Sequence, residues 1–250
     1  MQPYGMRFFS CVGLFSTNIL SLTGQCCWGR FTFSTNILSL RVQSSVYGAR
    51  SSSGNVTNNR IEIIDGQISS TAHGGCVSAN GKNAVGNSVI LRSGSVGSTI
   101  IGGHINTGNG NAIDNSVFIY GGTANNTVSG GYSNAGNATG NSVFVSGGTV
   151  RNNVYAGYAS SGNATNNTVT LAGSPDLSVS NIFGGRSSSG DAFTGNTLNV
   201  HDGGHVVKSL QNFEYMNFFV PSTMGNGGVM VTATESANIT NPDISRGWSF

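Results

Sequence analysis

One repeated phrase limits the folds open to this chain more than any other feature. Its clearest copy is Asn141–Gly157, where an Asn and a Ser lead into alternating apolar residues, a Gly-Gly pair and two further short apolar runs. A Gly-Gly element, or a variant with one Ala, recurs at spacings of 26, 28, 28, 26 and 28 residues, at Gly48-Ala49, Gly74-Gly75, Gly102-Gly103, Gly130-Gly131, Ala156-Gly157 and Gly184-Gly185. Such a period is typical of a solenoid, in which each repeat packs on its neighbours.

A second marker keeps step with the first. It is an Asn followed by Ser or Thr and an aliphatic residue, found at Asn87, Asn115, Asn141, Asn167 and Asn196, with an imperfect copy at Asn59. Apolar pairs of period two follow it, namely Ile61/Ile63, Val89/Leu91, Val117/Ile119, Val143/Val145, Val169/Leu171 and Leu198/Val200. Alternation of this kind places both members of a pair on one face of a strand.

Two further apolar series recur once per repeat and provide the cover that a one-sided strand needs. The first series is Ile68, Val96, Val150 and Val206. The second series is Val46, Ala72, Ile100, Val128, Val154 and Ile182. Stacked coils would align equivalent residues about 4.8 Å apart. We therefore predict an all-β fold, a single-chain parallel β-helix or β-solenoid of about six coils of 26–28 residues.

The repeats occupy residues 46–208, between two segments that do not follow the period. Residues 1–45 form an apolar N-terminal segment that contains the same eight residues twice, starting at Phe15 and at Phe33. Two interpretations of this segment stay open, a solenoid cap and a degraded export signal. Residues 209–250 are expected to form a C-terminal cap and tail, because the end of a stack exposes an unpaired strand edge.

Glycine and asparagine have expected structural roles within each coil. We expect the Gly-Gly pairs at corners, where φ is positive or two backbones approach closely. Paired asparagines are expected to stack as amide ladders in or beside turns, at Asn58-Asn59, Asn125-Asn126, Asn152-Asn153 and Asn166-Asn167.

The composition excludes several classes of function. Charged residues make up 8% of the chain and the net charge is +2 with no basic run, so no nucleic-acid partner is expected. No apolar run after Leu40 reaches the length of about 18 residues that a transmembrane helix needs. Cys76 is the single cysteine of the repeats, so no disulfide can form within them.

Catalysis on a β-helix usually needs clustered carboxylates, and the repeats offer none by alignment. Glu62 points outward between two inward residues, Asp65 follows it in the same coil, and neither recurs in the next coil. Asp114 and Asp191 are expected in turns. We therefore predict that the protein is not an enzyme and has no catalytic residues.

The histidines of the repeats are candidate metal ligands. His73 and His104 flank Gly-Gly pairs in successive coils, and His201, Asp202 and His205 have a spacing that could hold a metal ion or simply form a turn. The calcium-binding pattern of β-rolls is absent. The prediction is no metal site and no cofactor.

Two surfaces are candidate binding faces. The polar loops that follow the Gly-Gly pairs gather along one side of the stack. Outward Phe118, Tyr120 and Phe144 could form an aromatic stripe that contacts carbohydrate or protein, or that packs laterally.

Three groups of residues carry a family resemblance. They are the recurrent aliphatic-x-Gly-Gly motif at Asn181–Gly185, the Asn-Ser-Val phrase at Asn141–Gly148, and the closing segments Thr197–Val200, Ser209–Phe213 and Asn217–Pro221. Over residues 46–234 the chain resembles the passenger regions of bacterial autotransporter adhesins.

The resemblance implies a non-enzymatic adhesin-like protein, secreted or displayed on the bacterial outer membrane, with a role in virulence. Its implied partners are a host-surface protein or glycan, or a second copy of the chain. Because no series of alternating segments for a translocating barrel follows the repeats, we expect the sequence to be a fragment of a passenger. Two alternatives stay open, a carbohydrate-active β-helix enzyme such as a lyase or glycosidase, and a non-functional gene remnant.

Overall fold

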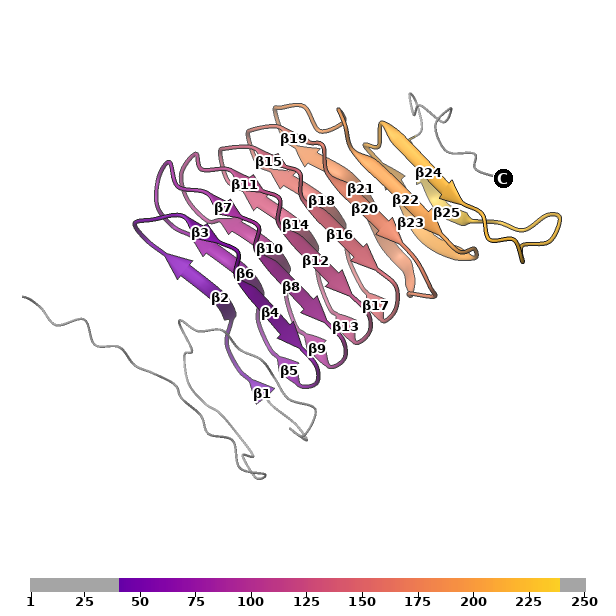
Figure 1. The fold of residues 1–250 in the computed structure, drawn as a ribbon, viewed down its shortest axis with the longest axis horizontal. Helices are drawn as coiled ribbons and strands as arrows, with labels where there is room; N and C mark the ends of the chain where they lie inside the picture. Colours follow the sequence, from indigo (N-terminus) through magenta and orange to yellow (C-terminus); the bar gives the residue numbers. More distant parts are fainter. Residues whose placement is uncertain (1–40, 239–250) are drawn as a thin grey trace, which may run out of the picture.

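The chain folds into one stack of parallel strands, shown in Figure 1. The computed structural model describes residues 41–238, so the expectations for residues 1–40 and 239–250 lie outside the described residues. Every strand pair in the described range is parallel. The predicted parallel β-solenoid is confirmed, with about 7 turns. Within residues 41–238 no helix is long and apolar enough to cross a membrane.

The strands form four sheets. The eight-stranded sheet contains β2 (Val46–Ser51), β6 (Ala72–Val77), β10 (Ile100–Ile105), β14 (Val128–Ser133), β18 (Val154–Ala159), β21 (Leu177–Ser187), β23 (His205–Gln211) and β25 (Val231–Ala237). The seven-stranded sheet contains β4 (Arg60–Ile63), β8 (Ser88–Leu91), β12 (Ser116–Ile119), β16 (Ser142–Val145), β20 (Thr168–Leu171), β22 (Thr197–His201) and β24 (Tyr215–Phe219). One five-stranded sheet contains β1 (Arg41–Val42), β5 (Gln67–Ile68), β9 (Ser95–Val96), β13 (Thr123–Ala124) and β17 (Thr149–Val150). The other contains β3 (Val56–Thr57), β7 (Ala84–Val85), β11 (Ala112–Ile113), β15 (Ala138–Thr139) and β19 (Ala164–Thr165).

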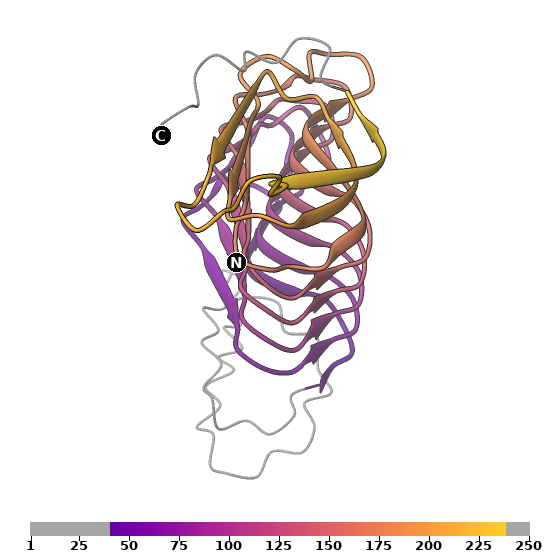
Figure 2. The ribbon, with the colours of Figure 1, turned by 90° about the vertical axis from the view of Figure 1, so that its right-hand side faces the viewer.

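Each regular coil contributes one strand to each sheet. The coil that starts at β12 continues through β13, β14 and β15, and β16 then lies directly on β12. Successive coils therefore repeat the same outline, as the view in Figure 2 shows. The short strands of the five-stranded sheets are the corners that join the two large sheets.

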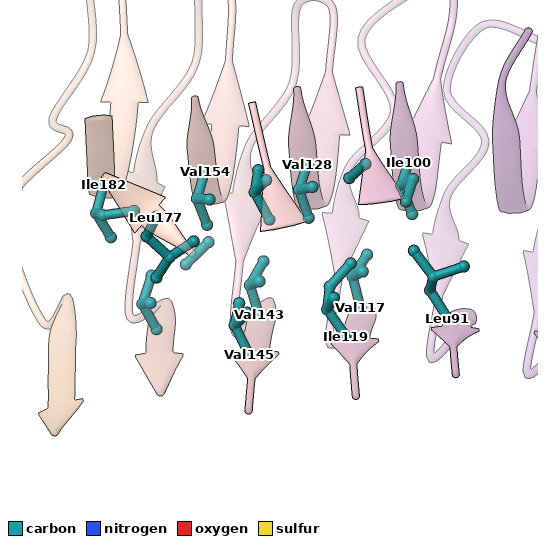
Figure 3. Packing of buried hydrophobic residues seen from close by; sticks show 14 of the residues in the cluster. Leu91, Ile100, Val117, Ile119, Val128, Val143, Val145, Val154, Leu177 and Ile182 are labelled. Carbon is teal, nitrogen blue, oxygen red and sulfur yellow. The ribbon is translucent and has the colours of Figure 1, made fainter. Parts of the chain in front are cut away.

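The core is a set of aliphatic ladders between the two large sheets. All twelve members of the predicted period-two pairs are at most 2% exposed. Figure 3 shows these side chains, such as Val117 and Val143, facing Val128 and Val154 of the eight-stranded sheet. Both series of covering residues are also buried, with one exception.

The exception is Val206, which was expected to point inward but is 40% exposed. Its neighbour Val207 is buried instead. The cause is a shift in the pairing of β21 with β23 between Leu177 and Asn181. Because of this shift, the repeat spacing no longer predicts which residue of β23 points inward.

A continuous ladder of asparagine side chains runs through the interior. The amide oxygen of Asn141 accepts hydrogen bonds from the backbone N–H and the side-chain amide of Asn115, both at 3.0 Å. The Asn141 amide donates to the carbonyl oxygen of Ala112 at 3.0 Å and to the amide oxygen of Asn167 at 3.2 Å. The same pattern links the completely buried members Asn87, Asn115, Asn141, Asn167 and Asn196. The predicted stacking of asparagine amides is thus found. Its buried members are the asparagines that precede Ser or Thr and an aliphatic residue in each repeat.

The second residue of each Gly-Gly element faces this ladder. A Cβ added to Gly131 would overlap the Asn141 side chain, and Gly75, Gly103 and Gly157 are in the same position beside their own ladder asparagines. The expectation of corner positions for these pairs was wrong in part. They lie inside the strands of the eight-stranded sheet and do not have positive φ, so close approach is the reason for glycine.

Positive φ occurs instead at the residue just before each ladder asparagine. The six residues there have φ between 52° and 71° and are Asn58, Gly86, Asp114, Gly140, Asn166 and Gly195. Only Gly, Asn and Asp occupy the position, which are the residues that tolerate the left-handed region best. The turn role expected for Asp114 is confirmed.

Parallel pairing continues beyond the regular repeats. β24 pairs with β22 although only 18 residues separate Asn199 from its partner Asn217. β25 extends the eight-stranded sheet beside β23. At the other end, β1 already pairs with β5 inside the expected N-terminal segment. The stack therefore includes strands on both sides of residues 46–208.

We expect Gly131→Ala to lower the free energy of unfolding by about 1–3 kcal/mol, because the added methyl must displace a buried, fully hydrogen-bonded amide. Gly225→Ala is the matched control, since no atom lies within 4 Å of its added Cβ and its φ is not positive. Urea denaturation followed by circular dichroism measures both variants. Equal midpoints for the two would contradict the proposed steric conflict.

Candidate functional site

The outer face of the eight-stranded sheet carries two columns of side chains, one on each side of the Gly-Gly positions. The first column contains Tyr47, His73, Ile101, Ser129, Tyr155 and Phe183. The second column contains Arg50, Cys76, His104, Tyr132, Tyr158 and Arg186. Strand register sets one residue of each column per coil, so the side chains lie beside their counterparts along the stack.

Aromatic rings in these columns contact one another in series. The rings of His104 and Tyr132 lie edge to face with centroids 5.0 Å apart, and those of Tyr132 and Tyr158 repeat this contact at 5.0 Å. In the first column the rings of Tyr155 and Phe183 stack at 4.8 Å. Contacts of this geometry stabilise the rings against one another and hold them in a fixed arrangement.

Between the columns lies a groove of about 280 Å³. Its lining includes the rings of His104, Tyr132, Tyr155 and Tyr158, together with Ile101, Ser129, Thr99, Thr127 and Arg186. This aromatic groove contains no carboxylate among its lining residues.

Arg186 provides the positive charge of the aromatic groove. Its guanidinium donates a 3.0 Å hydrogen bond to the Tyr155 hydroxyl and lies 5.6 Å from the centre of the Tyr158 ring. Burial raises the pKa of Tyr155, so its hydroxyl stays protonated at neutral pH. The groove thus combines flat apolar surfaces with hydroxyl groups and one cation.

At the end of the columns nearer the N-terminus, three candidate metal ligands come together in residues 41–238. The Nδ1 atoms of His73 and His104 are 3.3 Å apart, and the Cys76 sulfur lies 3.9 Å from the His104 Nδ1. His73 and Cys76 are buried, and the His73 Nε2 has no hydrogen-bond partner. Both histidines are candidate ligands in the sequence, but the prediction of no metal site did not anticipate their proximity to Cys76.

Burial lowers the pKa of both imidazoles. The His73 pKa falls well below 6.5, first through desolvation and then through the nearby charges of His104 and Arg50. The His104 pKa falls to about 4, through desolvation and then Arg50. Burial also raises the pKa of the Cys76 thiol. At neutral pH the cluster therefore consists of two neutral imidazoles and a thiol.

The second histidine group does not form a ligand set. The His205 Nε2 lies 2.8 Å from the backbone carbonyl oxygen of His201, and the His201 ring stacks on Phe219 at 4.1 Å. Asp202 has a φ of 64° and its carboxylate accepts a hydrogen bond from the backbone N–H of Gly173. The three residues therefore form the turn that was the alternative interpretation.

The acidic residues considered for catalysis have separate local partners. Glu62 lies between Arg60 and Arg92, which form ion pairs with it, and the Arg92 hydrogen bond is the main cause of its lowered pKa. The Asp65 carboxylate accepts from a backbone N–H of its own turn. The pKa of Asp191 is lowered first by a hydrogen bond from the Thr194 side chain and then by the backbone N–H groups of Phe193 and Thr194, from which its carboxylate accepts.

The expected aromatic stripe exists on the opposite large sheet. The ring centroids of Phe118 and Phe144 are 6.4 Å apart, and those of Tyr120 and Phe144 are 5.6 Å apart. Tyr120 is 43% exposed, and Arg92 lies over its ring.

Sequence reasoning missed the aromatic groove, although the signal was present. The residues directly before and directly after the Gly-Gly elements are aromatic, histidine or arginine in most coils. Both columns can be identified when the residues at fixed offsets from each Gly-Gly element are compared between coils. The alternation of apolar residues does not reveal them.

Comparison with protein-family models, with curated proteins and with solved structures finds no match to this chain. The class that the structure defines is therefore the parallel β-solenoid, and any finer assignment is a proposal.

We expect the free energy of unfolding to decrease as the pH falls from about 6.5 towards 4, because the unfolded chain binds protons on imidazoles that stay neutral in the fold. For His104 the loss is at most about 3 kcal/mol. His104→Tyr, which introduces the residue found at the paired position of the next coil, should flatten this dependence. Denaturation midpoints at several pH values measure it, and parallel curves for the two proteins would contradict the prediction.

Proposed function

We propose that this chain is a non-enzymatic adhesin-like repeat protein, secreted or displayed on the cell surface, and a piece of a bacterial autotransporter passenger. The parallel solenoid is compatible with a β-helix passenger. The resemblance of the repeat motifs to such passengers supports this proposal, and display at the outer membrane follows only from that resemblance. The partner that the surface suits best is a glycan.

The aromatic groove is the observation that carries this proposal. Sugar rings present flat patches of C–H groups edged by hydroxyls, and tyrosine offers a flat apolar face with a polar tip. Tyr132 and Tyr158 provide such faces, and Arg186 and Thr127 provide hydrogen-bond donors beside them. Because the rings are held by one another, they lose little conformational freedom when a ligand binds.

The charges of the groove favour binding over cleavage. Glycoside hydrolysis usually needs two carboxyl groups on either side of the scissile bond. The groove lining has none, and Glu62 is held between two arginines on the other large sheet. Arg186 favours glycans that carry a carboxylate or sulfate group, because a guanidinium binds such groups with two parallel hydrogen bonds.

We expect Tyr132→Ala and Tyr158→Ala to weaken glycan binding roughly 10-fold or more, since each removes a central aromatic face. The measurement is a screen of the full chain against neutral and acidic glycans, followed by titration of the best ligand. Tyr120→Ala is the matched control, because it removes the same side chain from the other large sheet.

Three outcomes would count against the proposal. Loss of binding in Tyr120→Ala alone would move the binding face to the stripe around Phe118. Release of new reducing ends from the bound glycan would identify a carbohydrate-active enzyme. Failure of every glycan class to bind would remove the glycan as partner.

A further inference from the structure

His73, Cys76 and His104 form a cluster that the proposed glycan binding does not explain. His73 and Cys76 stand on either side of Gly74-Gly75 in β6, and His104 is paired with Cys76 from β10. Two neighbouring strands of a rigid sheet therefore hold all three side chains. No loop has to move for them to meet.

The distances within the cluster are close to those around a bound metal ion. The two Nδ1 atoms are 3.3 Å apart, the Cys76 sulfur is 3.9 Å from the His104 Nδ1, and all three atoms lie within 4.8 Å of one another. Zinc binds histidine nitrogen at about 2.0–2.1 Å and cysteine sulfur at about 2.3 Å, so a tetrahedral site has edges of about 3.4 Å between nitrogens and about 3.6 Å between nitrogen and sulfur. The nitrogen–nitrogen distance matches such a site, whereas the Cys76 sulfur lies farther out and must move towards the two nitrogens to share an ion with them.

His73 and Cys76 compete for a hydrogen bond to the same nitrogen of His104. A neutral imidazole nitrogen carries either one proton or one lone pair. The His104 Nδ1 faces both the His73 Nδ1 and the Cys76 sulfur, so as an acceptor it can take a proton from only one of them. A cation uses a lone pair from all three atoms at once.

We infer that His73, Cys76 and His104 bind a single zinc ion, with its fourth coordination position open to the aromatic groove. Two imidazoles and a thiolate are ligands that zinc prefers, and three protein ligands leave one position for water or for an oxygen of another molecule. His104 also lines the groove, so the ion lies at the end of the glycan surface proposed above. The inference does not depend on glycan binding.

The charges around the cluster set the conditions for binding. Both imidazoles are neutral at pH 7 because burial lowers the pKa of each, so their lone pairs are available. Burial raises the pKa of the Cys76 thiol, so zinc must displace its proton and binds more weakly as the pH falls. The positive charge of Arg50 acts against burial and lowers the pKa of the Cys76 thiol, which favours the thiolate.

The test uses Co²⁺ as a spectroscopic probe, with Zn²⁺ as competitor. The full chain is prepared with Cys11, Cys26 and Cys27 replaced by serine, so that Cys76 is its only thiol. We expect one Co²⁺ per chain, with a thiolate-to-cobalt charge-transfer band that Zn²⁺ abolishes. In this background Cys76→Ser should remove the band. Cys76→Ser and His104→Tyr should each weaken the affinity for Co²⁺ by at least about 100-fold. Loss of a residue that only supports a metal ligand costs up to about 100-fold, so a larger loss identifies a ligand.

The controls separate loss of the site from loss of the fold. His201→Asn removes a histidine from a distant turn and should leave the band and the affinity unchanged. Cys76→Ser is expected to fold, because other coils carry Arg, His or Tyr at the same position, and circular dichroism checks this. The inference is overturned if the Cys76-only protein shows no charge-transfer band, or if the band persists in Cys76→Ser.

Discussion

The contact between the asparagine ladder and the glycine beside it is the constraint on which the rest of the structure depends. A ladder asparagine lies entirely inside the solenoid, and its amide has partners in the coils before and after it. The space for that amide exists because the facing residue has no side chain, as at Gly131 and Gly157. Since a buried amide without partners would be costly, the ladder forces neighbouring coils into one register. The aliphatic ladders of the core and the two outer columns of side chains follow the same register.

Some substitutions between coils show which parts of the repeat are constrained. The first residue of the Gly-Gly element is alanine at Ala156, and the side chain is buried there without disturbing the stack. The second residue faces a fully buried asparagine in five coils and is glycine in all of them. In the first coil, where Ala49 takes this place, the ladder begins at the partly exposed Asn59. The requirement for glycine is therefore strict where the amide is enclosed.

The sequence predicted the fold class and nearly all of the core, because alternation and a constant period depend only on local geometry. It failed at Val206, where a shift in strand pairing changed which residue points inward. The aromatic groove was missed because Tyr132 and Tyr158 come from different coils, and their contact depends on stacking. The proximity of His73 and His104 was missed for the same reason. Function was the least accessible, since no single coil contains a complete site.

The direction of the hydrogen bonds in the asparagine ladder has one more consequence. From Asn59 onwards, each side-chain amide donates one hydrogen bond to the amide oxygen of the next ladder asparagine towards the C-terminal end of the stack, and from Asn87 onwards each amide oxygen accepts from the asparagine before it. The series stops at Asn196, whose backbone N–H donates to Phe193 and whose side-chain amide donates to the carbonyl oxygens of Ala164 and Ala192 and not to a further asparagine. The strands themselves run across the rod and contribute little net dipole. The side-chain carbonyl groups of the ladder therefore all point the same way, with the partial negative charge of each oxygen directed towards the first coil.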